Sequence, residues 1–148
     1  MKDLIDTSTA NYCACANLRR TDLVVTQFYD GILAPGGISA LQFSLLCTID
    51  SFDSITINHL AKIIEMDRAT LSRHVKVLAD EELLSYEESG NQYTRRLRLT
   101  QEGEQVLECS WPLWQEAQRR IENNFGQNRF ESLLNELQAV RKVLNSAG

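Results

Sequence analysis

The segment from Thr56 to Gly103 constrains the fold of this chain more than any other part of its sequence. It reads TINHLAKIIEMDRATLSRHVKVLADEELLSYEESGNQYTRRLRLTQEG. The order of apolar, basic and turn-forming residues predicts a short helix, a turn, a basic helix, a strand, a glycine turn, a basic strand and a further helix. A helix that packs on one side and carries cations on another has the shape and charge to enter the major groove of DNA.

Hydrophobic residues at helical spacing predict four helices before the first of these strands. The first helix should run from about residue 11 to residue 33 and end at Pro35. The next three should follow Ser39, Thr56 and Asp67, whose side chains can accept hydrogen bonds from the first turn of a helix. The positions expected on the apolar stripes are Cys13, Val24, Phe28, Ile32, Leu45, Leu46, Ile49, Phe52, Ile57, Leu60, Ala61, Ile64, Leu71, Val75 and Leu78.

The two strands are expected at residues 83–88 and 93–99, joined by a turn at Gly90-Asn91. Successive side chains of a strand point to opposite faces, so the second strand should alternate between buried and exposed residues. Its inward leucines and outward arginines are Leu97, Leu99, Arg96 and Arg98.

Two long helices are expected to complete the chain. Thr100 should cap a helix that runs to about residue 125, in which Pro112 should cause a kink or weaken hydrogen bonds. Asn128 and Glu131 should form a capping pair for the last helix. A minimal DNA-binding unit does not contain these two helices or the first helix of the chain. Their apolar stripes therefore need another surface to pack against. Two copies could bury them against each other, which predicts a homodimer reading palindromic half-sites about 34–36 Å apart.

Length and charge narrow the possible classes of protein. The 148 residues fit a single domain, residues 1–148, and the net charge of −5 means that any DNA contact must come from a local basic patch. The first residues show no secretion signal, and no apolar run approaches the roughly 18 residues needed to span a membrane. We therefore expect a cytoplasmic protein without a membrane partner and with reduced cysteines.

The basic helix offers one residue suited to direct base recognition. Arg73 can donate two hydrogen bonds to guanine, and the methyl groups of the neighbouring Ala69 and Thr70 can contact thymine. Hydrogen bonds to phosphates are expected from a second set: Arg68, Ser72, Lys76, Arg95, Arg96 and Arg98. The alternative for the helix alone is an ordinary solvated face.

The cysteines suggest a sensor. Cys13 and Cys15 would point about 200° apart within one helix, which argues against a direct pair. Cys15 near a helix start, with Arg19 one turn on, is placed to favour a reactive thiolate. Oxidation of Cys15 or Cys13 is therefore a hypothesis for release of DNA, whereas Cys47 and Cys109 are interpreted as core positions. Neither histidine stands at a zinc-ligand spacing from the cysteines, so no metal is expected.

The order of these elements resembles the MarR family of winged-helix transcription regulators. The resemblance covers about residues 12–144 and rests on the helix from Leu41 to Asp50, the HLAKIIEMDRATLSRHVKVLADEELL block and the LRLTQEG joint. It implies a mainly α fold with a small β-wing, in which residues 39–103 form the winged helix-turn-helix and residues 11–33 and 104–146 the dimerisation helices.

The resemblance also implies a small-molecule effector pocket. Its walls would come from residues 12–20, 43–50 and 107–114, which include Cys47, Trp111 and Trp114. The family usually has Asp-Arg in the wing, where this chain has Asn91-Gln92-Tyr93. Glu82 and Tyr86 also stand where the family favours Gly and Arg.

Two functions remain open at this point. The first is a homodimeric, sequence-specific DNA-binding regulator, expected to be a repressor, whose affinity responds to a small molecule or to thiol oxidation. The alternative is a protein–protein regulator that kept the fold and lost tight DNA binding, which the acidic charge and altered wing favour. The chain has no nucleophile elbow, glycine-rich phosphate loop or metal-binding helix motif, so no catalytic residue and no cofactor is expected.

Overall fold

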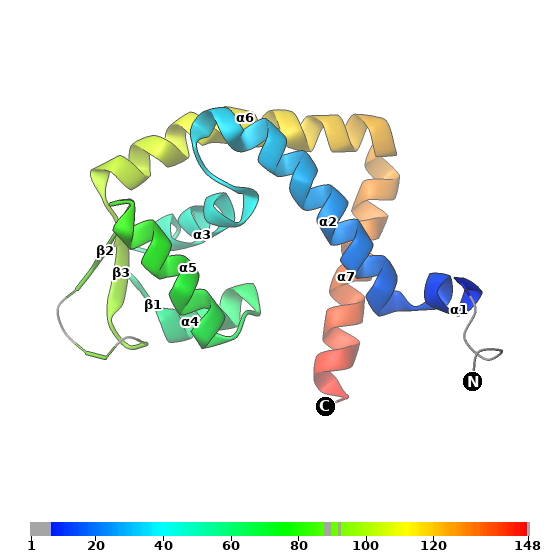
Figure 1. Ribbon diagram of the computed structural model, residues 1–148, viewed down its shortest axis with the longest axis horizontal. Helices are drawn as coiled ribbons and strands as arrows, with labels where there is room; N and C mark the ends of the chain where they lie inside the picture. Colours follow the sequence, from blue (N-terminus) through cyan, green and yellow to red (C-terminus); the bar gives the residue numbers. More distant parts are fainter. Residues whose placement is uncertain (1–6, 88–89, 92, 148) are drawn as a thin grey trace.

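The computed structural model describes residues 7–87, 90–91 and 93–147, and it is mainly helical with a small sheet (Figure 1). The elements in chain order are α1 (Thr7–Tyr12), α2 (Ala14–Leu33), a 3-10 turn (Ala34–Gly36), α3 (Ala40–Asp50), β1 (Ile55–Thr56), α4 (Ile57–Ile64), α5 (Arg68–Asp80), β2 (Leu84–Tyr86), β3 (Arg96–Leu99), α6 (Gln101–Phe125) and α7 (Gln127–Ser146). α3, α4, α5 and the sheet form one lobe. α6 runs from that lobe to α7, which lies beside α2.

The expected first helix is divided in two. Cys13 lies between α1 and α2 with an extended backbone, φ −76° and ψ 117°, and occupies the N-cap position of α2. The prediction of one continuous helix from residue 11 is therefore wrong at its start. Cys13 is also exposed in the single chain instead of lying on a buried stripe.

The sheet is antiparallel in the order β1-β3-β2. Leu84 pairs with Leu99 and Tyr86 with Leu97, so the leucines of β3 face the core, as the alternation predicted. β2 and β3 are shorter than expected, and β1 was missed because two residues are too few to show a period. Gly90 has φ +94°, which suits the predicted turn; residues 88, 89 and 92 of that turn lie outside the described part of the chain.

Local hydrogen bonds explain where the helices of this lobe begin. The Ser39 side chain accepts from the Gln42 backbone, and the Gln42 side chain accepts from the Ser39 backbone. Thr56 and Asp67 accept from the backbone N–H three residues on, at 3.1 Å and 2.9 Å, and Thr100 does the same for α6 at 3.0 Å. All four predicted caps are confirmed. Each satisfies a backbone donor that has no partner within its helix.

α6 continues through Pro112 to its end at Phe125, and α7 begins two residues later at Gln127. The predicted capping pair of Asn128 and Glu131 is wrong. Gly126, with φ +95°, makes the bend between the two helices, and α7 starts at Gln127 without a side-chain cap. Asn128 already lies inside the helix, where its carbonyl accepts the Ser132 hydroxyl at 2.9 Å.

One continuous core holds the winged lobe together. Its fully buried side chains include Leu45, Leu46, Ile49, Ile57, Leu60, Leu71, Val75, Leu78 and Leu97. Four residues expected on apolar stripes or in the core are exposed in the single chain: Cys13, Val24, Phe52 and Cys109. Phe52 follows the end of α3, stays 37% exposed and contacts the ring of His59. Cys109 faces solvent because the next residue, Ser110, takes the buried position on α6.

No single helix in the described residues is long and apolar enough to cross a membrane. The pair formed by Ala14–Gly36 and Ala40–Asp50, bent by 70°, meets the criteria of length and composition only when taken together.

Candidate nucleic-acid interface

α4 and α5 form a helix-turn-helix with a three-residue turn. Glu65 ends α4 in the left-handed region, with φ 55°, and Asp67 caps α5. The Asp67 carboxylate accepts from the Thr70 backbone N–H at 2.9 Å. Hydrogen bonding to the Thr70 side chain, and then to its backbone, lowers the pKa of Asp67. The turn thus fixes the direction in which α5 leaves the lobe, as in DNA-binding helix pairs.

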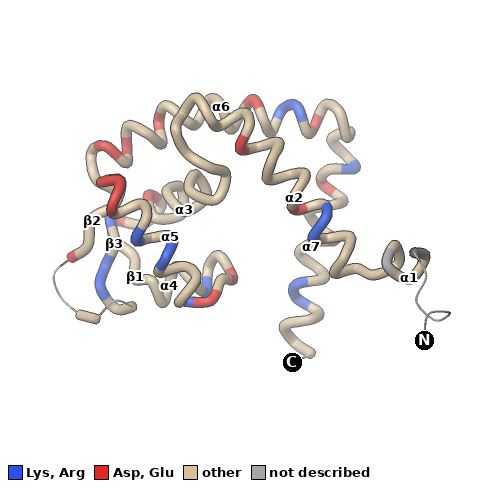
Figure 2. Tube along the Cα trace, in the orientation of Figure 1, with Lys and Arg blue, Asp and Glu red and all other residues tan. Residues whose placement is uncertain are grey.

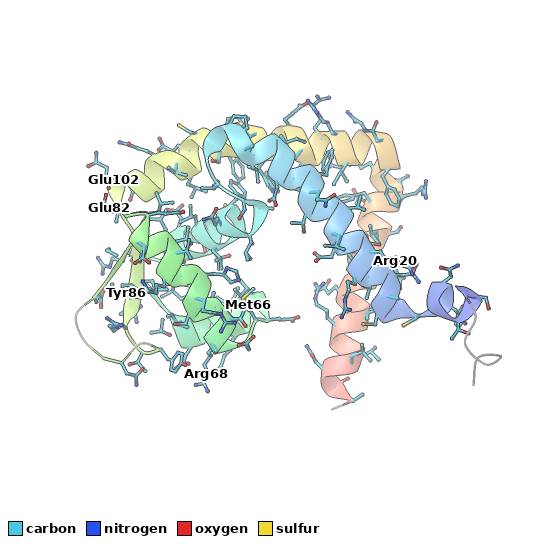
Figure 3. All side chains as sticks on the ribbon, viewed as in Figure 1. Arg20, Met66, Arg68, Glu82, Tyr86 and Glu102 are labelled. Atoms are coloured by element: carbon cyan, nitrogen blue, oxygen red, sulfur yellow. The ribbon has the colours of Figure 1, made fainter. Side chains whose placement is uncertain are left out.

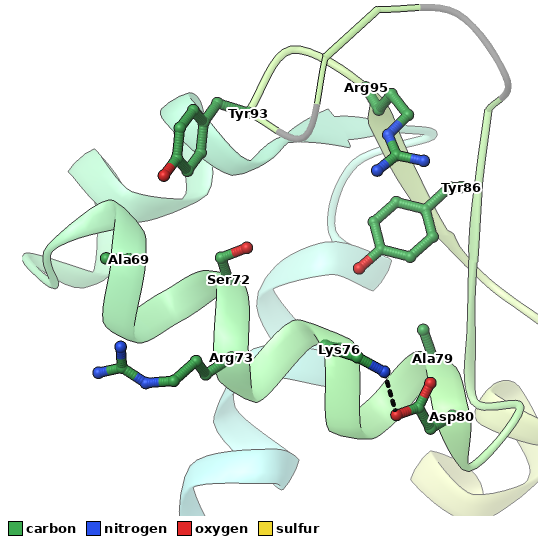
Figure 4. Close-up of a pocket in the computed structure, with 9 residues that line it drawn as sticks. All are labelled: Ala69, Ser72, Arg73, Lys76, Ala79, Asp80, Tyr86, Tyr93 and Arg95. Atoms are coloured by element: carbon green, nitrogen blue, oxygen red, sulfur yellow. Dashed lines mark hydrogen bonds and ion pairs between the residues drawn. The ribbon is translucent and has the colours of Figure 1, made fainter.

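α5 has one buried face and one exposed face. Leu71, Val75 and Leu78 are fully buried, as the periodicity predicted. Arg73 and Lys76 are exposed on other sides of the helix. The Arg73 guanidinium donates to the Thr70 hydroxyl at 3.1 Å, which turns it toward the start of the helix (Figure 4).

A hollow of about 490 Å³ separates α5 from the wing, the strand pair β2–β3 with its connecting turn. We call it the wing hollow. Its lining residues are Ala69, Ser72, Arg73, Lys76, Ala79, Asp80, Tyr86, Tyr93 and Arg95. It therefore joins cations from the helix with a cation from the wing, although these are separated by some twenty positions in the sequence (Figure 4).

Two tyrosines position arginines beside α5. The Arg95 guanidinium lies 4.7 Å from the centre of the Tyr86 ring, and that of Arg68 lies 5.2 Å from the centre of the Tyr93 ring. Figure 3 shows Arg68 and Tyr86 on this lobe, distant from Arg20 on α2. The Arg95 Nε is buried and has no hydrogen-bond partner among the described residues. The sequence analysis missed both tyrosines, although each lies close to the turn that joins the two strands.

An acid also borders the wing hollow. The Lys76 ammonium lies 2.6 Å from the Asp80 carboxylate one turn along α5, and this contact raises the pKa of Lys76. Burial raises the pKa of the Tyr86 hydroxyl, and the nearby Arg95 opposes that rise. Lys76 therefore remains charged at neutral pH, while Asp80 offsets part of its field.

The remaining wing arginines lie elsewhere. Arg96 donates to the Ser54 hydroxyl and, at 2.6 Å, to the Ser54 carbonyl, and Arg98 lies 3.2 Å from Glu87. Both are exposed, as the strand alternation predicted, but neither lines the wing hollow. Figure 2 shows the cations on α5 and β3, and the acids at the start of α6 and at the junction of α5 with β2.

The residues proposed for sensing form two separate groups. Cys13, Cys15 and Arg19 are exposed at the start of α2. Cys47, Trp111 and Trp114 meet at a second hollow of about 410 Å³ between α3 and α6.

Within one chain, residues 12–20 do not line the second hollow; Tyr29 of α2 does, and its hydroxyl donates to Gln118 at 2.8 Å. Phe43 lies within the expected wall of residues 43–50, and its ring centre lies 6.3 Å from that of Trp111 and 5.9 Å from that of Trp114. Across the described residues, no group of three or more His, Cys, Asp and Glu side chains could hold a metal ion.

Comparison with known proteins decides the family. A sequence model of the MarR family matches residues 38–91. The M. tuberculosis transcriptional regulator MosR is 30% identical over 88% of this chain and 97% of its own, with a TM-score of 0.73. This chain belongs to the MarR family. No curated protein sequence matches it.

Two further structures of MarR-type fold were solved with DNA. The complex of MosR with DNA is 29% identical to this MarR-family chain, covers 88% of it and 98% of its own chain, and has a TM-score of 0.76. The transcriptional repressor CouR, bound to a 23-mer duplex, is 19% identical, covers 93% and 98%, and has a TM-score of 0.79. The second likeness supports the winged-helix fold alone.

Proposed function

We propose that this MarR-family chain is a homodimeric transcription repressor that places α5 in the major groove of a palindromic duplex. The observation that carries the proposal is the wing hollow, where Arg73, Lys76 and Arg95 converge from two elements of an acidic chain. A local concentration of cations is the electrostatic requirement for binding DNA phosphates. The solved complex of MosR with DNA supports it by analogy.

The geometry suggests a division of roles. Arg73 reads guanine, and Ala69 and Thr70 contact neighbouring bases, because these residues lie at the N-terminal end of the exposed side of α5. The groups beside or within the wing hollow bind phosphates that pass between helix and wing: Arg68, Ser72, Lys76 and Arg95. Arg96 and Arg98 bind phosphates at the outer edge of the DNA interface, away from the wing hollow.

A second copy of the chain is proposed to cover the apolar surface of α2 and α7. The described residues leave large hydrophobic side chains exposed there: Leu18, Leu23, Val24, Val25, Leu133, Leu134, Val140, Val143 and Leu144. A groove of about 680 Å³ between α2, α6 and α7 is almost wholly apolar. A cluster of exposed hydrophobic side chains of this kind is uncommon on the surface of a monomer and typical of a protein–protein interface. Dimerisation would set two α5 helices on one face.

Selection from a random DNA pool tests the proposed function. We expect enrichment of a palindrome whose half-sites are about 10 base pairs apart, the spacing of one helical turn. The selected duplex should bind with a steep salt dependence, because each phosphate contact contributes about one unit of slope. The alternative function, a protein–protein regulator, is favoured by the Lys76–Asp80 pair and the missing wing arginine. It predicts that no sequence is enriched.

Thiol oxidation is proposed to weaken DNA binding through the start of α2. Cys15 is exposed in the first turn of this helix, four residues before Arg19. Because Cys13 has an extended backbone, the helical spacing that argued against its approach to Cys15 does not apply. Attack of a thiolate on hydrogen peroxide forms an S–O bond and breaks the O–O bond, which yields a sulfenic acid and releases hydroxide; the hydroxide then takes up a proton from solvent.

We expect peroxide to release DNA from the unmodified chain but not from Cys13→Ser/Cys15→Ser, as measured by electrophoretic mobility. Cys109→Ser is the matched control, because Cys109 is also exposed but lies on α6. Unchanged peroxide sensitivity of the double variant contradicts the proposal.

A further inference from the structure

Two hollows adjoin between α3 and α6. The first, of about 410 Å³, contains Phe43, Trp111 and Trp114; the second, of about 420 Å³, lies between Asp50 and Glu108. Cys47 and Trp111 line both, so the two form one continuous surface, which we call the aromatic cleft. The DNA contacts proposed above do not use it.

The walls of the aromatic cleft are nearly parallel rings. The ring centres of Trp111 and Trp114 are 5.2 Å apart with planes inclined by 22°, and those of Phe43 and Trp114 are 5.9 Å apart at 16°. Trp111 nevertheless remains 47% exposed. All three rings lie within 6.3 Å of one another, and the exposed part of Trp111 offers apolar area to a further flat ring. The shape of the cleft therefore favours a planar aromatic ligand.

The charges of the cleft have one sign. Asp50 and Glu108 line it, and no lysine, arginine or histidine of the described residues does so. The Cys47 thiol is half-buried, and burial together with the nearby Asp50 raises its pKa, so it stays neutral and adds no charge to the cleft. An aromatic carboxylate would approach two like charges here, whereas a cation would meet opposite charges and indole faces.

We infer that the aromatic cleft binds planar aromatic cations in preference to aromatic acids. The inference takes up the small-molecule pocket that the family resemblance implied, and it adds the charge and shape of the ligand. Cation–π attraction to Trp111 and Coulomb attraction to Asp50 and Glu108 act in the same direction. The aromatic surface supplies affinity, and the acids select the charge.

Three probes of similar size and different charge test the inference: 1-methylquinolinium, 1-naphthalenemethanol and 1-naphthoate. Calorimetry on the full chain without DNA gives their affinities. The chain has two tryptophans, Trp111 and Trp114, and both line the cleft, so corrected tryptophan fluorescence locates the binding. We expect the cation to bind at least about tenfold more tightly than the carboxylate, with quenching, and the neutral probe to lie between them.

Two variants separate the charge of the cleft from its shape. Asp50→Asn/Glu108→Gln should bring the affinities of the three probes to within about threefold, because it removes both acids and keeps the rings. Glu136→Gln, on the exposed surface of α7, is the control and should keep the preference. Equal or tighter binding of the carboxylate, a preference unchanged in the double variant, or no binding of any probe at millimolar concentration overturns the inference.

The test also separates this inference from the proposed function. Because affinity and quenching are measured without DNA, a cation that binds the cleft but does not release a selected duplex supports the ligand class and contradicts only the effector role. If the chain selects a palindrome but binds no cation, the proposed function is supported and the inference about the cleft is contradicted.

Discussion

Arg73→Ala should reduce affinity for the selected duplex by about 10- to 100-fold, because a bidentate arginine–guanine contact contributes about 1–3 kcal/mol of discrimination. The side chain is exposed, and its one described hydrogen bond is to Thr70, so its removal should leave the fold unchanged. Binding to a random duplex should fall far less, since phosphate contacts dominate there. Fluorescence anisotropy with both duplexes measures the difference.

Arg119→Ala is the matched control for Arg73→Ala. Arg119 is also exposed but lies on α6, where it pairs with Glu116 at 2.6 Å, and its loss should change neither duplex affinity appreciably. Sedimentation should show that both variants keep the oligomeric state of the parent. If Arg73→Ala binds the selected duplex as well as the parent chain does, the assigned orientation of α5 on DNA is wrong.

Gly103→Ala should lower the free energy of unfolding by about 1–3 kcal/mol, the usual cost of overpacking a tight contact. A Cβ at Gly103 would collide with the Leu83 carbonyl oxygen and lie 3.1 Å from the Leu83 carbonyl carbon. That carbonyl also accepts the Thr100 backbone N–H at 3.1 Å, so the joint between sheet and α6 would have to shift. Urea denaturation measures the loss.

Gly31→Ala is the control for a glycine substitution on an open surface. Gly31 lies in α2, and no atom lies within 4 Å of its added Cβ. Because alanine favours a helix over glycine, stability should rise by about 0.5–1 kcal/mol. Equal unfolding of the Gly103 variant and the parent would contradict the close contact between α6 and the start of the sheet.

The sequence predicted those features of the fold that depend on neighbours along the chain. Caps at Ser39, Thr56, Asp67 and Thr100 were found because each needs only its own side chain and a backbone N–H three residues away. The buried seam of α5 was found because helical periodicity is fixed by the backbone.

The errors occurred where tertiary packing decides the outcome. Phe52 and Cys109 have the composition of core residues, but the end of α3 and the rotation of α6 leave them exposed. Asn128 resembles a cap, but α7 has already begun at Gln127, directly after the bend at Gly126. A residue pattern carries no information about the angle between two helices.

The candidate interface was only partly predicted, because some of its contacts also depend on tertiary packing. Alternation along β3 correctly exposed Arg96 and Arg98, but Ser54 and Glu87 hold them away from the wing hollow. Arg95 reaches α5 because it stacks on Tyr86 of the neighbouring strand, a contact that depends on the path of the wing. The aromatic cleft likewise joins Phe43 to tryptophans nearly seventy positions later.

Hydroxyl-radical footprinting of the selected duplex, with the number of bound chains measured in parallel, tests the central claim most directly. The account predicts two chains per duplex and two protected half-sites about 10 base pairs apart, since paired α5 helices should enter successive major grooves on one face. Protection of a single site by one chain, or uniform protection without half-sites, would contradict the proposed arrangement.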